Sequence, residues 1–157
     1  MLRGRICILP IPFSEVCSSF LPSVSGARVE SALVMADSII CERAFEFSAR
    51  ILHLCAKLWN QGPAARRVAS ELIRCGTSIG ANAEEAQDGQ TKPDYIAKMS
   101  VSRKESRETL YWLRLGLRAK VVTQEEVAWE VREATELRRM IVAAIITAQS
   151  NQSRGQP

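Results

Sequence analysis

The sequence predicts an all-α fold, an antiparallel up-down-up-down four-helix bundle over residues 37–151. Apolar residues recur every three or four positions through four segments, which is the spacing of one face of a helix. No segment shows the two-residue alternation that is typical of a half-buried strand. Only a few residues connect the four segments, and such short connections place consecutive helices side by side in opposite directions.

The first predicted helix carries its apolar residues at steps of four and three. Asp37 or Ser38 can accept the free N–H groups at its start, and Gly62-Pro63 ends it and opens the next helix. Its expected core residues are Ile40, Ala44, Phe47, Ile51, Leu54 and Leu58.

The second predicted helix runs from about Pro63 to Gln87. Gly76 and Gly80 lie inside it, although each glycine costs about 1 kcal/mol relative to alanine in a helix interior. Close approach of a neighbouring helix would explain both glycines, and a local kink is the rival explanation. The expected core residues are Val68, Leu72, Cys75, Ile79, Asn82 and Ala86.

The third and fourth predicted helices begin with capping sequences. Thr91 is the expected N-cap of a helix that runs to about Lys120, and Thr123 with Glu126 forms a capping box. The third helix would bury Ile96, Met99, Arg103, Ser106, Leu110, Leu113 and Leu117, and the fourth Val127, Val131, Ala134, Leu137, Ile141, Ala144 and Ala148. Residues after Ser150 lack this period, so we predict that the helix frays there and that residues 152–157 form a disordered tail.

Residues 1–36 differ from the remainder of the chain. Two arginines before a short apolar run loosely imitate a secretory signal, but Pro10 and Pro12 interrupt the run and Glu15 ends it. The run is also too short to span a bilayer. We predict a disordered extension, or one that arises from an upstream start codon with Met35 as the true start.

The composition argues for a single domain in a reducing compartment. A chain of 157 residues that is 46% hydrophobic can bury a core without cross-links. Its five cysteines are an odd number with no C-x-x-C pair, which argues against a disulfide framework or zinc site and favours the cytoplasm. We expect Cys41, Cys55 and Cys75 to behave as small buried apolar residues.

The residues needed for common catalytic sites are missing from the sequence. His53 is the single histidine, and a di-iron bundle site needs a Glu three residues before each of two ligand histidines. A nucleophilic serine or cysteine would also have to use His53, and the sequence has no phosphate-binding glycine loop. We therefore expect no enzymatic activity, no metal and no cofactor.

Charge is unevenly distributed along the chain. Residues 92–120 hold eight Lys/Arg against three Asp/Glu, whereas residues 123–150 hold three against five. The two helices could simply complement each other, or the basic helix could bind a polyanion. The candidate nucleic-acid-binding residues are Lys98, Lys104, Arg107, Arg114 and Arg118; Arg103 is a weaker candidate because its seam position would bury it.

Polar residues at seam positions predict a polar layer between the second and third helices. Asn82 and Glu85 would meet Ser102, Arg103 or Ser106 there, because buried polar groups need hydrogen-bond partners. Such a layer could fix the helix register, or it could mark a subunit or ligand contact.

Two adjacent aromatic residues of the third helix are candidates for an oligomer interface. Adjacent residues of a helix point about 100° apart, so Tyr111, Trp112 and Leu113 cannot all face one core. Either the core-facing stripe is wide, or Tyr111 and Trp112 lie at an interface between subunits, where such residues are favoured.

Residues 72–86 (LIRCGTSIGANAEEA), 95–99 (YIAKM), 104–109 (KESRET) and 111–113 (YWL) closely resemble a bacterial family. This is the 23S rRNA intervening-sequence protein family of four-helix bundles, similar in fold to the accessory variability determinant of diversity-generating retroelements. The resemblance covers residues 39–148. It implies a ring-like pentamer without enzymatic activity and, for the retroelement relatives, a basic surface that binds nucleic acid and a reverse transcriptase.

These observations favour a cytoplasmic homo-oligomer that binds RNA without sequence specificity through the basic third helix. The alternative is a protein-interaction scaffold or an accessory factor for a mobile-element or retroelement enzyme. An enzyme or small-molecule binder with a site in the bundle interior is a third hypothesis, which a polar pocket with a perturbed carboxylate would favour.

Overall fold

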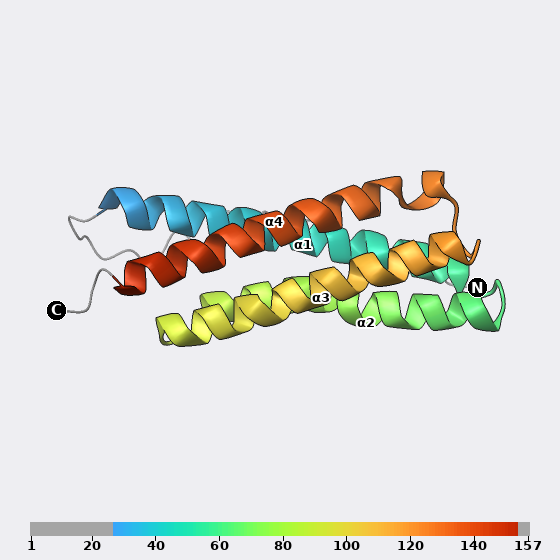
Figure 1. Cartoon of the computed structure of the whole chain (residues 1–157), viewed down its shortest axis with the longest axis horizontal. Coiled ribbons are helices and arrows are strands. Elements are labelled where there is room, and N and C mark those ends of the chain that lie inside the picture. The colour runs from blue at the N-terminus through green and yellow to red at the C-terminus, as the bar shows by residue number, and fades with distance from the viewer. Residues whose placement is uncertain (1–26, 154–157) are drawn as a thin grey trace, which may run out of the picture.

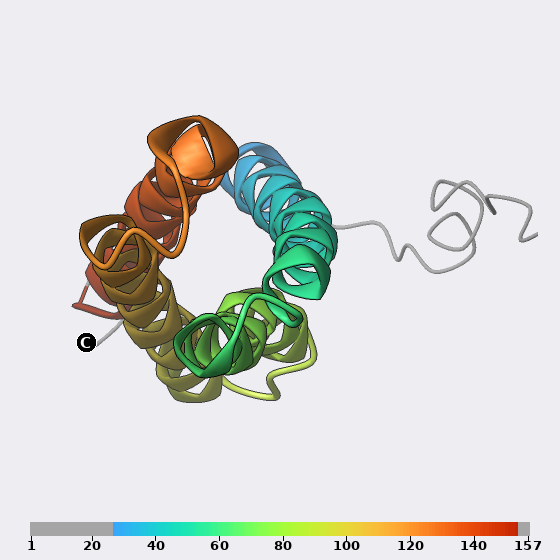
Figure 2. The ribbon, with the colours of Figure 1, turned by 90° about the vertical axis from the view of Figure 1, so that its right-hand side faces the viewer.

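Four helices form an antiparallel up-down-up-down bundle, as the sequence predicts (Figure 1). The structure is a computed structural model that describes residues 27–153, with side chains over 37–150. Its elements are α1 (Ala27–Leu58), α2 (Pro63–Gln87), α3 (Lys92–Arg118) and α4 (Gln124–Ser153). Each helix packs against the next and α4 closes onto α1, so α1 and α3 lie diagonally opposite each other (Figure 2).

The capping sequences define the helix ends where they are present. The Thr91 side chain accepts a hydrogen bond from the Asp94 amide at 3.3 Å. Thr123 and Glu126 form the predicted reciprocal box, in which the Thr123 amide donates to the Glu126 carboxylate at 2.8 Å. Gly62 adopts a φ of 115° at the start of α2, a left-handed conformation that favours glycine.

The first and last helices are longer than predicted. α1 begins at Ala27, ten residues before Asp37, and α4 continues to Ser153. Residues 27–36, which the sequence analysis placed in the extension, contain no Gly or Pro and several good helix formers, so nothing interrupts the helix there. Residues 1–26 of that extension and residues 154–157 of the tail lie outside the described residues.

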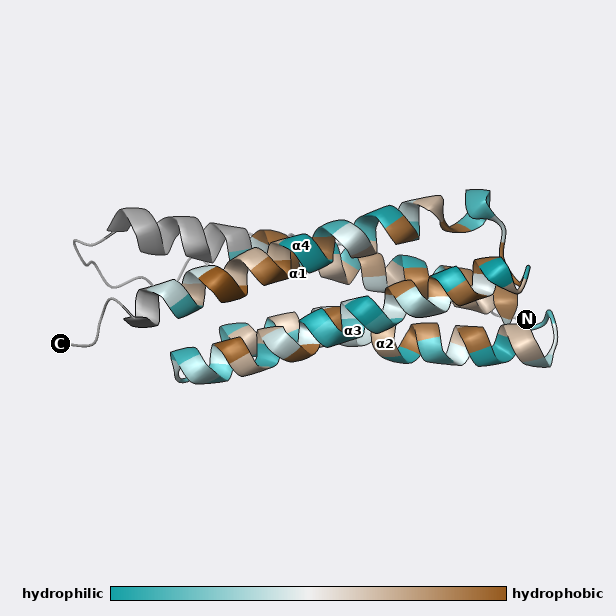
Figure 3. Cartoon of the chain, viewed as in Figure 1, coloured by the Kyte–Doolittle hydropathy of each residue, from teal (hydrophilic) through white to brown (hydrophobic). Residues whose placement is uncertain are grey.

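Most of the predicted core is confirmed. All six expected residues of α1 are buried, and on α2 only Asn82 is half-buried. Hydrophobic and hydrophilic residues alternate around each helix, as expected for amphipathic helices (Figure 3). The three cysteines are buried as predicted, and desolvation raises the pKa of the Cys41 and Cys55 thiols to about 12 and that of Cys75 to about 11.

The predicted core face of α3 is confirmed except at Arg103. Met99, Ser106 and Leu113 are buried, and the partly buried Ile96, Leu110 and Leu117 pack against the core. Arg103 is exposed, and the neighbouring Ser102 is buried. Thr109 and Gly116 are also buried, although the prediction did not include them. Serine, threonine and glycine do not count as apolar in a periodicity analysis, so the pattern did not reveal these three positions.

Close approach of α1 accounts for the two glycines of α2. A Cβ on Gly76 would lie 3.0 Å from the Ile51 side chain, and one on Gly80 would lie 3.4 Å from the Ala44 backbone. α2 is a continuous helix through both positions. The small residues therefore let the backbones of α1 and α2 pack closely.

Candidate nucleic-acid interface

Four of the five predicted RNA-binding residues form one stripe on the outer side of α3. Lys104, Arg107, Arg114 and Arg118 follow one another at three, seven and four residues, so they project from the same side of the helix. All four are exposed. The fifth residue, Lys98, instead forms an ion pair with Glu85 of α2.

Two acidic residues of α4, Glu130 and Glu133, form ion pairs with α1. Arg43 donates two hydrogen bonds to the Glu133 carboxylate, at 2.6 and 2.8 Å. Arg50 donates to the buried Glu130 at 3.2 Å, and its guanidinium lies 4.2 Å from the Trp129 ring centroid. Of the two alternatives that the sequence left open, complementarity between the third and fourth helices is not supported by these ion pairs, which join α4 to α1.

The acidic residues of α3 face α2. Arg74 forms ion pairs with Glu105 and Glu108 of α3 and with Glu71 of its own helix. Burial raises the pKa of the Glu105 carboxyl, and nearby Arg74 opposes that shift. Within residues 37–150, the exposed cations Arg103, Lys104, Arg107, Arg114 and Arg118 form no ion pair.

The polar layer has different partners from those predicted. The Ser102 hydroxyl donates to the Ile79 carbonyl of α2 at 2.8 Å, and this bond joins the two helices in the core. Asn82 instead donates to the Ser78 carbonyl of its own helix at 2.8 Å, while Ser106 donates to Arg103 at 2.8 Å. Of the three residues of α3 that were predicted for this layer, Ser102 therefore makes the contact with α2, whereas Arg103 is exposed.

Tyr111 and Trp112 have different environments. Trp112 is half-buried: its indole N–H donates to Glu108 at 3.3 Å, and the Arg67 guanidinium lies 5.7 Å from its ring. Tyr111 is 56% exposed and touches Trp112 edge-on, with ring centroids 5.4 Å apart. Trp112 thus contributes to packing within the chain, and Tyr111 offers free aromatic surface.

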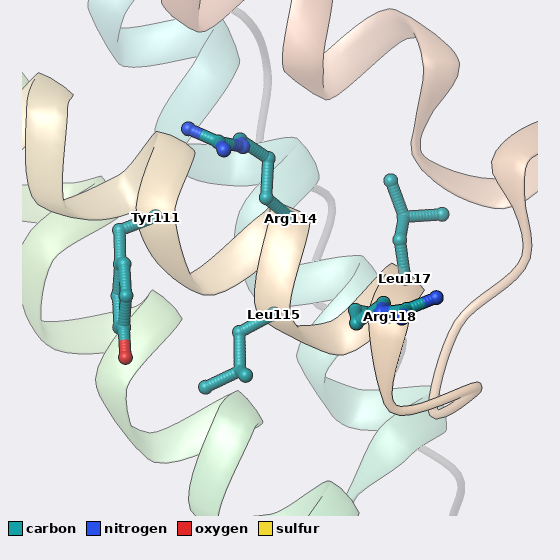
Figure 4. Close-up of a pocket in the computed structure, with 5 residues that line it drawn as sticks. All are labelled: Tyr111, Arg114, Leu115, Leu117 and Arg118. Atoms are coloured by element: carbon teal, nitrogen blue, oxygen red, sulfur yellow. The ribbon is translucent and has the colours of Figure 1, made fainter.

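A shallow hollow lies beside the basic stripe. It is lined by Tyr111, Arg114, Leu115, Leu117 and Arg118, all from the last turns of α3 (Figure 4). Tyr111 and Leu115 point toward the α2 side, whereas Arg114 and Leu117 point toward the α4 side (Figure 4). The hollow therefore brings aromatic and apolar side chains next to two cations of the basic stripe, Arg114 and Arg118.

Sequence reasoning missed two cations on the neighbouring helix. Arg132 and Arg138 of α4 are exposed and, within the described side chains, form no ion pair. α3 and α4 are antiparallel, so residues at equal distances from the turn that joins them lie at the same height in the bundle. By this count, Arg132 lies at about the height of Tyr111 and Arg138 at about the height of Glu105. The sequence analysis considered only the net charge of α4, which is negative. That sum does not show that Glu130 and Glu133 face α1 while these two arginines remain exposed.

A second hollow lies between α1 and α4, and the described residues that line it do not form a recognisable catalytic site. His53 is exposed there beside Arg50 and Lys57, and Glu126 and Glu130 complete the lining. Glu130 is engaged by Arg50, and its second carboxylate oxygen is buried without a hydrogen-bond partner. In the part of the chain that the structure describes, no three His, Cys, Asp or Glu residues gather to hold a metal, and no helix is long and apolar enough to cross a membrane.

Sequence comparison assigns the bundle to a family. The 23S rRNA-intervening sequence protein family matches residues 36–143, which include nearly all of the described bundle and the stripe on α3. The chain belongs to this family. The match begins one residue before Asp37 and therefore leaves out most of the N-terminal extension.

A solved structure of another protein has a similar fold. It is a Bacteroides thetaiotaomicron protein of unknown function from the S23 ribosomal protein family, with 32% sequence identity and a TM-score of 0.65. The alignment covers 70% of this chain and 97% of that one. No curated protein matches the sequence significantly.

Proposed function

We propose that this protein is a non-enzymatic, self-associating four-helix bundle that binds RNA through the exposed cations of α3. The observation that carries the proposal is the direction of the ion pairs. Acidic residues of α4 pair with α1, and those of α3 pair with α2, which leaves the α3 cations available to an external anion. Clustered cations of this kind neutralise successive phosphates of a nucleic-acid backbone.

Non-specific contact to the RNA backbone fits this surface better than base-specific readout. The cations lie on a convex helix face, and arginine and lysine there contact phosphates without reading sequence. Self-association would multiply a stripe of four to five cations by the number of copies. The family takes its description from the intervening sequence of 23S rRNA, so an RNA with such a sequence is a suitable first ligand.

The proposal is tested by removing cations from α3 and measuring RNA affinity by fluorescence anisotropy at about 50 mM salt. The variant carries Arg103→Gln, Arg107→Gln and Arg114→Gln, three exposed residues on the α4 side of the helix. We expect a loss of affinity of about tenfold or more, because each phosphate contact contributes to counterion release.

The control removes two cations from other helices. Lys57→Gln and Arg66→Gln change exposed residues of α1 and α2 that form no ion pair within the described side chains. We expect this control to bind RNA nearly as well as the unaltered chain. Equal losses per removed charge in the two variants would show that net charge alone drives binding, and the absence of any RNA binding would favour the alternative of an acidic protein partner.

A further inference from the structure

An exposed aromatic residue lies inside the basic stripe of α3. The stripe consists of Lys104, Arg107, Arg114 and Arg118, and a gap of seven residues separates the middle two. Tyr111 fills this gap, so the spacing along the helix becomes three, four, three and four residues, and all five side chains project from the same outer side. The ring therefore stands between two pairs of cations that form no ion pair within the described side chains.

The ring of Tyr111 is supported by its neighbour and still offers a free face. It is 56% exposed and meets the Trp112 ring at an angle of 80°. Because one ring meets the other edge-on, Trp112 covers at most one face of Tyr111. Trp112 itself is half-buried, and the Arg67 guanidinium lies 5.7 Å from its ring centroid. Tyr111 is therefore the better placed of the two to receive a flat ligand.

The hollow at the end of α3 lies directly beside this ring. Tyr111 and Leu115 lie on the same side of the helix, and Arg114, Leu117 and Arg118 complete the lining (Figure 4). Its volume of about 560 Å³ falls within the range of roughly 300–1,000 Å³ that is usual for small-molecule sites. The aromatic and apolar part suits a planar base, and the guanidinium groups suit phosphate. A nucleotide combines these two chemical groups.

The spacing of the cations also fits a nucleotide within a strand, which has a phosphate on each side of its base. Arg107 lies about 6 Å before Tyr111 along the helix axis, and Arg114 about 4.5 Å after it. Glu108, three residues before Tyr111, already pairs with Arg74 of α2. The cations on both sides of the ring thus remain available to the phosphates of one strand.

We infer that this hollow binds an unpaired nucleotide of an RNA, with its base stacked on Tyr111 and its flanking phosphates on Arg107 and Arg114. Paired bases are enclosed in the duplex, whereas bases of loops and bulges can turn outward and stack on an aromatic side chain. Such stacking accepts any base, because every base has a π-face. The inference rests on the proposed function and narrows its ligand from RNA in general to RNA with unpaired nucleotides.

The test compares two RNA duplexes that differ only in a bulge of unpaired nucleotides, by fluorescence anisotropy with the full chain at about 50 mM salt. The unaltered chain should bind the bulged RNA about tenfold more tightly, the size expected for one stacked base. Tyr111→Leu should lower this affinity to that for the paired duplex, since leucine lacks the ring, and Tyr111→Phe should keep the preference. The salt dependence should be the same for Tyr111→Leu, because its phosphate contacts remain.

The controls separate a lost stacking contact from other effects of the substitution. Phe45→Leu removes a ring of α1 that is 73% exposed, and it should keep the preference for the bulge. Circular dichroism should show native helix content in every variant, since the altered residues are exposed.

Equal affinity of the unaltered chain for the two RNAs, or an equal loss for both in Tyr111→Leu, would overturn the inference. A changed sedimentation coefficient of Tyr111→Leu without RNA would assign the ring to a contact between copies and would also overturn it. Salt-dependent binding that does not respond to Tyr111 would contradict this inference alone, whereas the absence of RNA binding would contradict the proposed function as well.

Discussion

Asp37 is a buried carboxylate that makes stability depend on pH. It accepts a hydrogen bond from the Tyr95 hydroxyl at 2.8 Å, which joins α1 to α3 at one end of the bundle. Burial raises the pKa of Asp37 above its ordinary value of 3.8, and the hydrogen bond from Tyr95 partly opposes that shift. The folded chain thus holds this proton more tightly than the unfolded chain does.

Asp37→Asn should therefore raise the melting temperature at pH 7 by a few degrees and leave it nearly unchanged near pH 3. Because the folded pKa is raised, the stability contribution of Asp37 is full below about pH 4 and is lost as pH rises through the folded pKa. Asparagine stays neutral and keeps an acceptor for Tyr95. Thermal melts across this pH range check the prediction, and an equal shift at both pH values would show that packing, rather than charge, is responsible.

Ser102 is a second residue whose environment makes a quantitative prediction. Ser102→Ala should lower the free energy of unfolding by about 1 kcal/mol, because it removes a buried hydrogen bond to the Ile79 carbonyl. Ser100 is half-buried on the same helix and, within the described residues, its side chain makes no hydrogen bond. Urea denaturation should show little change for Ser100→Ala, and equal effects of the two substitutions would contradict the assignment.

At the level of helices, the two glycines of α2 should respond differently to alanine. Gly80→Ala should raise the free energy of unfolding by about 0.5–1 kcal/mol, since alanine favours the helix and the space accepts a methyl group. Gly76→Ala should lower it by about 1 kcal/mol, because the fully buried Ile51 must shift. Denaturant melts of both variants check the contrast, and equal stabilisation would mean that α1 and α2 pack less closely than described.

The sequence predicts those helix ends that are determined by interactions between residues close together in the chain. The Gly62-Pro63 pair, the Thr91 cap and the Thr123–Glu126 box each act within a few residues, and each lies where it was predicted. The start of α1 was missed, because residues 27–36 carry neither a breaker nor a recognisable cap. Ser102 and Thr109 were missed as core residues of α3, because the burial of a serine or threonine depends on which carbonyl its hydroxyl can reach.

The pairing of charged residues could not be predicted from one helix at a time. The sequence shows a basic third helix and an acidic fourth, and these two are neighbours in the bundle. Which side of α4 its glutamates occupy decides whether they neutralise α3, and that side is set by the packing of all four helices. Glu130 and Glu133 face α1, so the exposed cations from Arg103 to Arg118 of α3 remain without acidic partners within the described side chains.

At the scale of the whole molecule, the ion pairs divide the surface of α3 into two parts. The side that faces α2 carries Glu105 and Glu108, which pair with Arg74. Arg103, Arg107 and Arg114 form no ion pair within the described side chains, and they make up the basic edge that suits RNA. Arg132 and Arg138 would extend this basic edge onto α4. A ring built from such copies would present its basic edges repeatedly, so affinity for RNA should depend on assembly.

The central claim is that cations on α3 neutralise RNA phosphates, and the salt dependence of binding tests it most directly. Affinity for a structured RNA is measured from about 50 to 200 mM salt, for the unaltered chain and for the variant with Arg103→Gln, Arg107→Gln and Arg114→Gln. We predict steeply salt-dependent binding, with a log–log slope that becomes shallower by about 2 or more in the variant, since each phosphate contact contributes about 0.7–0.9. Identical slopes would show that these arginines do not contact phosphates and would contradict the proposed interface.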